Sequence, residues 1–163
     1  EPAVLNPMFE GYRYHFTGLH HGPTGHPTED AEICDALMKR LFNKVDAHLD
    51  ELELNEEYML EDADIMIIAY GSVSLGVTEA INRLRKEGIK VGMFRPKTVW
   101  PSPAKRINEL MKKFDKVLVT ELNMGQFADE VQRVSGRSDF DTLFKVNGRP
   151  LSPLEIIEKV KGM

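Results

Sequence analysis

Residues 64–76 read DIMIIAYGSVSLG, a nearly continuous apolar run that ends in a glycine and a serine. A run of this kind is typical of a strand that is buried on both faces of a parallel sheet. The pair Gly71-Ser72 favours a turn into a helix, and Gly88 is expected to end that helix. We interpret the stretch as the first strand-helix unit of an α/β domain.

The alternation of strand and helix continues to the end of the chain. Apolar runs predict further strands, and amphipathic stretches predict the helices between them. The expected strands cover 90–94, 116–120 and 142–146, with a short edge strand near 58–60, and the expected helices cover 103–113, 126–134 and 152–160. Alternation of this type implies right-handed crossovers and helices on both faces of the sheet. The predicted fold is a three-layer α/β/α domain with a mostly parallel sheet.

The part of the chain before this domain has a different character. A helix is expected from Thr28, which can cap it, because apolar residues recur at helical spacing from Ile33 to Leu49 and would form its buried face. Residues 1–27 are rich in glycine and proline and resemble an interdomain connector, which suggests the back part of a longer polypeptide. The alternative is that only an initiator or a tag was removed. We divide the chain into a connector at 1–27, a linking helix at 28–53 and the α/β domain at 54–163.

Composition argues against several classes of function. Of the 163 residues, 42% are apolar, which is enough for one core, and the net charge is -5 with basic and acidic residues interspersed. This pattern argues against a nucleic-acid partner, and the longest apolar run, at 65–70, is too short to span a membrane. The single cysteine, Cys34, excludes an internal disulfide and cannot alone hold an iron–sulfur cluster. We expect a cytoplasmic protein that binds neither nucleic acid nor a membrane, with Cys34 in the core.

Gly71 and Ser72 lie where a strand meets a helix, a position at which backbone amides can hold a phosphate. The stretch lacks the ending of a P-loop and the spacing of a dinucleotide site. An ordinary turn and helix cap is the favoured interpretation, and an anion site at these two residues is the alternative.

Four histidines crowd a stretch rich in glycine and proline, and clustered imidazoles suggest a metal site. No two of these histidines have the helical i, i+4 spacing that prepares a tetrahedral site. We therefore favour polar loop contacts over metal binding for His15, His20, His21 and His26.

The least generic residues lie in two loops, RPKTVWPSP at 95–103 and ELNMGQ at 121–126, each of which follows a short hydrophobic strand. Both should emerge at the same edge of the sheet, where open α/β folds place their working residues. Trp100 is a candidate interface anchor on its proline-braced loop, and the alternative is that it packs into its own core. We expect no catalytic residue here, but an interface formed by Arg95, Thr98, Trp100, Pro101, Glu121, Asn123, Gly125 and Gln126.

Four blocks of the chain together resemble the C-terminal part of the alpha subunit of 2-oxoacid:ferredoxin oxidoreductases, most of all the 2-oxoglutarate type. The blocks are TGLHH at 17–21 with Gly25 and Pro27, MKR at 38–40 with Lys44, AYGS at 69–72, and the two loops at 95–101 and 121–126. The resemblance implies the transketolase C-terminal-domain-like fold for residues 54–163. It also implies that an upstream pyrimidine-binding domain is missing here.

The function implied by this resemblance belongs to a complex. The parent reaction would be oxidative decarboxylation of a 2-oxoacid, 2-oxoglutarate foremost, to its acyl-CoA, with ferredoxin taking the electrons. Thiamine diphosphate, Mg and the iron–sulfur clusters would be held by other parts of the complex, so this chain would hold no cofactor and would be non-catalytic. Its partners would be the beta subunit, with gamma and delta subunits as further candidates, ferredoxin through the complex, and a second copy of itself.

Two alternatives from other classes stay open. One is a freestanding α/β module that binds a nucleotide or another phosphate at Gly71-Ser72. The other is a purely structural dimerisation domain. Only the first of these would be stabilised against unfolding by a nucleotide, because only the first would bind one.

Overall fold

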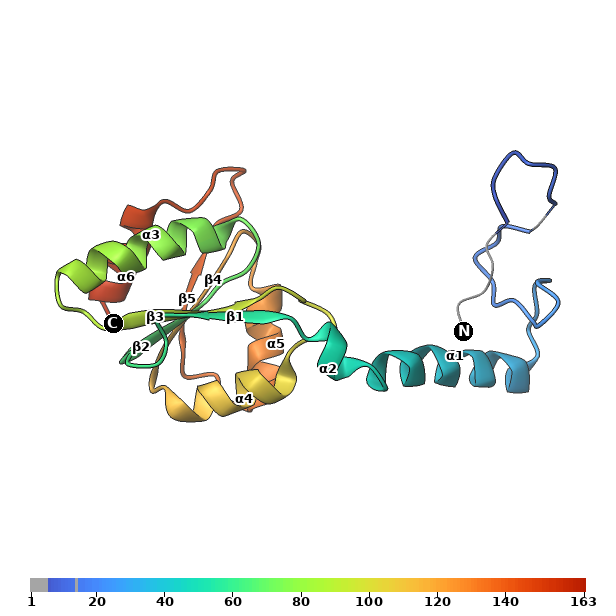
Figure 1. The fold of residues 1–163 in the computed structure, drawn as a ribbon, viewed down its shortest axis with the longest axis horizontal. Helices are drawn as coiled ribbons and strands as arrows, with labels where there is room; N and C mark the ends of the chain where they lie inside the picture. The colour runs from blue at the N-terminus through green and yellow to red at the C-terminus, as the bar shows by residue number, and fades with distance from the viewer. Residues whose placement is uncertain (1–5, 14) are drawn as a thin grey trace. The chain divides into compact units, whose positions relative to one another are not determined.

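The computed structural model describes residues 6–13 and 15–163, so residues 1–5 and 14 of the expected connector lie outside the described part. The chain divides into two compact units, Glu1–His48 and Leu49–Met163, each of which is described by itself (Figure 1). No helix in the described ranges is both long enough and apolar enough to cross a membrane.

The second unit is built on a five-stranded sheet with the strand order β1-β3-β2-β4-β5. β1 is antiparallel to β3, and the other neighbours are parallel, as the apolar runs predict. The edge strand β1 ends at Tyr58, before its expected position near 58–60, because the chain turns at Met59 with a φ of 49°. The strands are β1 (Asn55–Tyr58), β2 (Ile65–Ile68), β3 (Val91–Pro96), β4 (Lys116–Glu121) and β5 (Asp141–Phe144).

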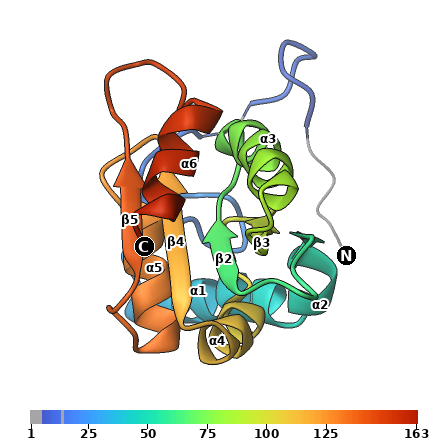
Figure 2. The ribbon, with the colours of Figure 1, turned by 90° about the vertical axis from the view of Figure 1, so that its left-hand side faces the viewer.

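Helices cover both faces of this sheet, and Figure 2 shows β5, β4, β2 and β3 side by side between them. One face carries α3 (Val73–Lys86) and α6 (Pro153–Lys161), and the other carries α4 (Ala104–Lys113) and α5 (Gln126–Ser135). Successive side chains of β2 point to opposite faces, so Ile67 packs under α3 and α6 while Ile68 packs under α4 and α5. The predicted three-layer α/β/α fold is confirmed.

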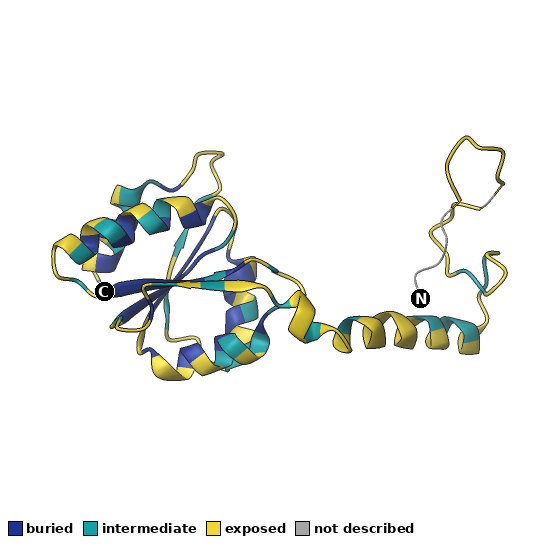
Figure 3. Ribbon diagram, in the orientation of Figure 1, coloured by how far each residue is buried: buried dark blue, intermediate teal, exposed yellow. Residues whose placement is uncertain are grey.

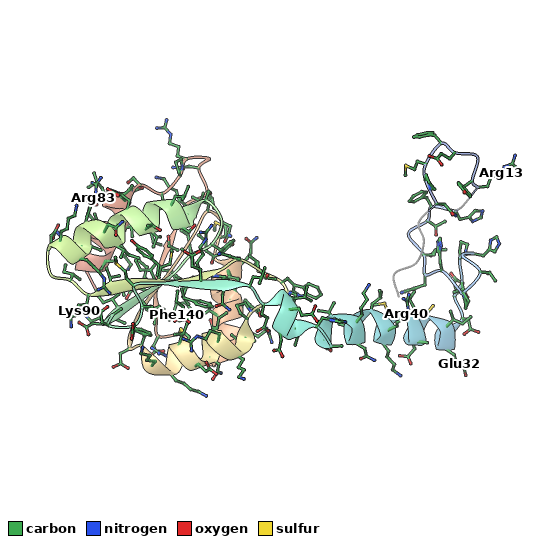
Figure 4. The ribbon with its side chains drawn as sticks, viewed as in Figure 1. Arg13, Glu32, Arg40, Arg83, Lys90 and Phe140 are labelled. Atoms are coloured by element: carbon green, nitrogen blue, oxygen red, sulfur yellow. The ribbon has the colours of Figure 1, made fainter. Side chains whose placement is uncertain are left out.

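Burial follows the layers, with all four residues of β2 buried (Figure 3). Side chains fill the spaces between the sheet and the helices, where Phe140 packs with the core under α4 and α5 (Figure 4). Arg83 lies on the outer surface of α3 instead, where its Nε pairs with Glu79 Oε1 at 2.7 Å. The domain therefore has a well-packed scaffold from which its loops extend.

Helix α6 and the first helix of the chain begin at capping residues, but the first helix begins at a different residue from the one expected from the sequence. Ser152, at the expected start of the last helix, caps α6 and forms a reciprocal capping box with Glu155. The first helix, α1 (Ala31–Asp46), begins after Asp30 and not after Thr28, because Asp30 Oδ1 accepts hydrogen bonds at 3.0 Å from the amides of the first turn. Aspartate obeys the same capping rule as threonine, and its negative charge also interacts favourably with the positive end of the helix dipole.

The buried face expected for the first helix is not buried within its own unit. α1 contains no buried residue, and it ends at Asp46, so that residues 49–52 form the separate short helix α2 (Leu49–Leu52) of the second unit. The loop at 21–23 lines a hollow beside Ile33 without covering it. Cys34 is half-buried, not in a core, and its Sγ lies 3.8 Å from the Thr28 carbonyl.

Candidate functional site

The carboxyl ends of β2 and β4 meet where the connections of the sheet diverge. The two strands are parallel neighbours, but β2 leads into α3 on one face and β4 leads into α5 on the other. Open α/β folds bind ligands in the crevice at such a switch point. The turn at 69–72 and the loop at 121–126, both selected from the sequence, lie there.

Glu121, the last residue of β4, is buried and accepts hydrogen bonds from other segments. Its Oε2 accepts from the Tyr70 hydroxyl at 2.9 Å and from the Phe127 amide at 3.0 Å, and its Oε1 accepts from the Ala128 amide at 2.9 Å. Phe127 and Ala128 belong to the first turn of α5, whose amides have no acceptor within the helix. The carboxylate therefore caps α5 and links it to the end of β2.

Asn123 closes the loop between β4 and α5. Its Nδ2 donates to the Tyr70 hydroxyl at 2.8 Å and to Glu121 Oε2 at 2.9 Å. Its Oδ1 accepts from the Gly125 amide at 2.8 Å and from the Gln126 amide at 3.1 Å. Both ends of the side-chain amide are thus engaged inside the loop, which fixes the course of the backbone.

Gly125 occupies a place in this loop that only glycine fits. Its φ is 103°, and a Cβ added there would lie 2.8 Å from the ring of Phe144 in β5. A side chain at this position would push the loop away from β5. Gly125 is buried, so its contribution to the predicted interface is to shape the loop.

Tyr70 joins the loop after β2 to the loop after β4. Burial, and then the hydrogen bond to Glu121, raise the pKa of Tyr70 to about 12. At neutral pH its hydroxyl is therefore protonated and donates to Glu121 while it accepts from Asn123. Tyr70 was not among the residues selected individually from the sequence, although its place between the apolar run and the turn was the signal that could have identified it.

Two of the three polar residues predicted for the interface in the 121–126 loop, Glu121 and Asn123, point inward. Glu121 is buried, Asn123 is half-buried, and Gln126 is exposed. Because Glu121 and Asn123 use their polar atoms within the domain, they do not present them at the surface. The role of this loop in an interface stays a prediction.

The loop at 97–103 lies at the same edge of the sheet and is held near both ends. Thr98 donates its hydroxyl hydrogen to the Leu52 carbonyl at 2.5 Å, and Ser102 donates to the Glu130 carboxylate of α5. In the described part of the chain, no hydrogen bond joins this loop directly to the 121–126 loop. The two loops share an edge and are connected through α5.

Trp100 projects from the loop at 97–103. Its side chain is 69% exposed, so the alternative that Trp100 packs into the core of its own domain is wrong. Pro101 follows through a cis peptide bond. Arg95 lies in β3, where its Nη1 pairs with Glu56 Oε2 of β1 at 3.4 Å. Among the predicted interface residues, Trp100 offers the largest exposed side chain.

Two open hollows flank Leu122 at the switch point. The smaller, about 200 Å³, is lined by Gly71 and Ser72 and has no basic side chain in its lining. The larger, about 480 Å³, shares Ser72 and Leu122 and is also lined by Lys145 and Arg149. The Ser72 side chain makes no capping hydrogen bond to α3. An anion site at Gly71-Ser72 stays an untested alternative.

The histidine-rich stretch of the first unit forms local contacts. The rings of His15 and His26 meet edge to face with their centroids 5.6 Å apart, and His21 Nε2 lies 2.8 Å from the Thr17 hydroxyl. In residues 6–13 and 15–163, no three histidine, cysteine, aspartate or glutamate side chains converge as ligands for a metal ion. The described residues therefore do not fit a metal centre or an iron–sulfur cluster.

Comparison with known proteins gives a family and several relatives. Residues 63–156 match the model of the pyruvate:ferredoxin oxidoreductase core domain II family. The 2-oxoglutarate synthase subunit KorA of Methanothermobacter marburgensis is 38% identical over 156 residues, which are 94% of this chain and 42% of the relative. The chain thus spans at most about half the length of the curated relatives it matches.

Two solved structures have folds similar to that of this chain. The chain is similar to the 2-oxoglutarate:ferredoxin oxidoreductase from Magnetococcus marinus, solved with 2-oxoglutarate, coenzyme A and succinyl-CoA bound, with a TM-score of 0.75 and 30% identity over 96% of this chain and 27% of that one. A split-gene transketolase, described as an inactive beta4 tetramer, has a TM-score of 0.56 and 18% identity over 67% of this chain and 40% of that one, a likeness of fold alone. The predicted transketolase-like fold class is confirmed.

Proposed function

The chain belongs to the pyruvate:ferredoxin oxidoreductase core domain II family, and on this premise we propose that it is an assembly domain of the alpha subunit of a 2-oxoglutarate:ferredoxin oxidoreductase. The relatives that match most of its length and are named as a 2-oxoglutarate synthase subunit support the alpha-subunit assignment. The exposed Trp100 carries the assembly role, because a large aromatic side chain on a braced loop at the switch-point edge is the kind of anchor that protein interfaces use.

The reaction of the complete complex would be the oxidative decarboxylation of 2-oxoglutarate to its acyl-CoA, with ferredoxin as the electron acceptor. Support comes from the Magnetococcus marinus structure, which contains 2-oxoglutarate, coenzyme A and succinyl-CoA. Thiamine diphosphate with Mg and the iron–sulfur clusters would be bound by other parts of the complex, because the described residues here provide no convergent metal ligands and the chain has one cysteine. We therefore assign this chain no step of the chemistry.

The function of this chain's residues would be to present a surface of fixed shape to a partner subunit. We define the carboxyl-edge surface as the exposed parts of the loops at 97–103 and 121–126. Thr98 and Ser102 hold the first loop, and the hydrogen bonds among Tyr70, Glu121 and Asn123 hold the second. Loops that are ordered before binding lose less conformational entropy when a partner docks.

The partner we propose for this surface is the beta subunit, with gamma and delta subunits as further candidates and ferredoxin reached through the complex. The names of the relatives, which are subunits, support a multi-subunit setting. Self-association and a cytoplasmic location stay predictions from the sequence.

Association with a beta subunit of a 2-oxoglutarate:ferredoxin oxidoreductase from the same organism tests the proposal. Sedimentation of the two purified proteins, singly and mixed, should give a joint species that contains both. In parallel, the chain alone should give no turnover with 2-oxoglutarate, coenzyme A and an artificial electron acceptor. Absence of the joint species would refute the assembly role, and turnover by the chain alone above a contaminant control would refute the non-catalytic assignment.

A further inference from the structure

The loop at 121–126 alternates between side chains that point inward and side chains that point outward. Glu121, Asn123 and Gly125 lie inward or half-buried, whereas Leu122 is 38% exposed and Met124 is 78% exposed. Across residues 121–125 the usual arrangement of a surface loop, with polar side chains outward, is reversed. The hydrogen bonds that hold the loop therefore also hold two apolar side chains in solvent.

We propose that Leu122 and Met124 are contact residues of the carboxyl-edge surface, and that they bind a segment of the beta subunit in which an apolar side chain lies next to an acidic one. This inference rests on the proposed function. It adds the residues that make the contact and the chemistry of the partner segment.

The first support is that hydrogen bonds to the rest of the domain hold the loop that carries Leu122 and Met124. The Glu121 carboxylate fixes both ends of the loop, through Tyr70 on β2 and through the amides of Phe127 and Ala128 on α5. Asn123 fixes the turn itself through the Gly125 and Gln126 amides. A loop fixed in this way cannot fold its apolar side chains into the domain without breaking buried hydrogen bonds, which is costly.

The second support is the apolar surface around the pair. Val146, which is 60% exposed, lines the larger hollow of about 480 Å³ together with Leu122 and Pro150. Leu75, in the first turn of α3, is 72% exposed near the same edge. An apolar side chain of a partner can enter the hollow beside Leu122 and remove this surface from water.

The third support is one uncompensated positive charge at the hollow. Lys145 lines it but is neutralised by Glu155, with Nζ and Oε1 2.7 Å apart. Arg149 lines the same hollow, is exposed, and forms no ion pair with any residue in the described ranges. A guanidinium next to an apolar hollow is complementary to a carboxylate that flanks an apolar side chain.

Site-specific photocrosslinking in the co-expressed complex tests this contact. A benzoylphenylalanine is placed at Met124 or, as the matched control, at Met59, which is 44% exposed and lies next to the amino end of β3 at the opposite edge of the sheet. We expect a crosslink from position 124 to a beta-subunit peptide with an acidic residue beside the attached apolar one, and none from position 59. A crosslink from position 124 to a second copy of this chain, or to a beta-subunit peptide without an acidic residue, would overturn the inference.

Affinity measurements give the second readout. The double variant Leu122→Ala with Met124→Ala should weaken binding to the beta subunit by about tenfold or more, while Met59→Ala leaves it unchanged. Arg149→Glu should weaken binding and make it less dependent on salt, and Arg149→Lys should restore most of it.

The outcomes separate this inference from the function on which it rests. If the wild-type chain binds the beta subunit and the double variant binds equally well, the contact residues are wrong and the assembly role stands. If the wild-type chain does not bind the beta subunit, both fail. Each variant is compared by thermal melting with the wild type, so that a loss of binding in a folded protein is not confused with unfolding.

Discussion

The Tyr70 hydroxyl donates to Glu121 Oε2 at 2.9 Å and thereby ties together the carboxyl ends of β2 and β4, 51 residues apart in the chain. The bond spans the switch point of the sheet, where the two strands lead to helices on opposite faces. It joins a strand end, a turn and the start of α5 into one rigid unit. The loops that carry the proposed contacts are therefore part of the scaffold.

Removing only the Tyr70 hydroxyl should loosen this unit. We expect Tyr70→Phe to lower the free energy of unfolding by about 1–3 kcal/mol, because a buried carboxylate loses one donor and the Asn123 amide loses one acceptor. Urea denaturation measures the change. The matched control is Tyr58→Phe, since Tyr58 donates at 2.8 Å to the neutral Asn82 amide and should cost about 0.5–1.5 kcal/mol. An equal or smaller loss for Tyr70→Phe would contradict the importance of the bond to Glu121.

Acid should weaken the end of the domain that carries Glu155. The hydrogen bond from Lys145 and those from the Ser152 amide and hydroxyl hold the pKa of Glu155 at about 2, below its ordinary value of 4.5. A carboxyl whose pKa is lower in the folded state stabilises the fold above its ordinary pKa and loses that contribution as the pH falls toward the folded value. The melting temperature should therefore fall between about pH 4.5 and pH 2 more steeply in the wild type than in Glu155→Gln.

The comparison of these two melting curves is the measurement, because the other carboxyls titrate alike in both proteins. Parallel curves across the interval would mean that Glu155 is not held by Lys145 and Ser152 in solution.

Nucleotides should not stabilise the chain. The smaller hollow, which both Gly71 and Ser72 line, has no basic side chain in its lining and so lacks the charge that a phosphate site ordinarily provides, whereas Lys145 and Arg149 line the larger hollow, which Gly71 does not line. A thermal melt with increasing ATP, ADP or inorganic phosphate should show no saturable rise. A saturable rise that disappears in Ser72→Ala would instead support the phosphate-binding module.

The sequence was most informative where structure is decided locally. The apolar run at 65–70 predicted a strand buried on both faces, and the serine and glutamate three residues apart at 152 and 155 form the capping box that starts α6. Strand positions, helix order and the common edge of the two loops follow from such local patterns and from the rules of parallel sheets.

What the sequence could not provide depends on contacts between distant segments. Glu121 was selected from the sequence as an interface residue, but its side chain is buried because the strand order places β4 beside Tyr70 of β2. The amphipathic pattern of α1 predicted a buried face, but a pattern marks a face without identifying what covers it, and no residue of α1 is buried. Asp30 and Thr28 both satisfy the capping rule, so spacing alone did not decide between them.

The most direct test of the proposed carboxyl-edge surface is to measure, on the single variant Trp100→Ala, both its binding to the beta subunit and its unfolding. Because Trp100 is 69% exposed, we predict that binding weakens by roughly 2 kcal/mol or more, about thirtyfold in affinity, while the free energy of unfolding changes by less than about 0.5 kcal/mol. Unaltered binding together with a loss of about 3–5 kcal/mol in stability, as expected for a core tryptophan, would contradict the account.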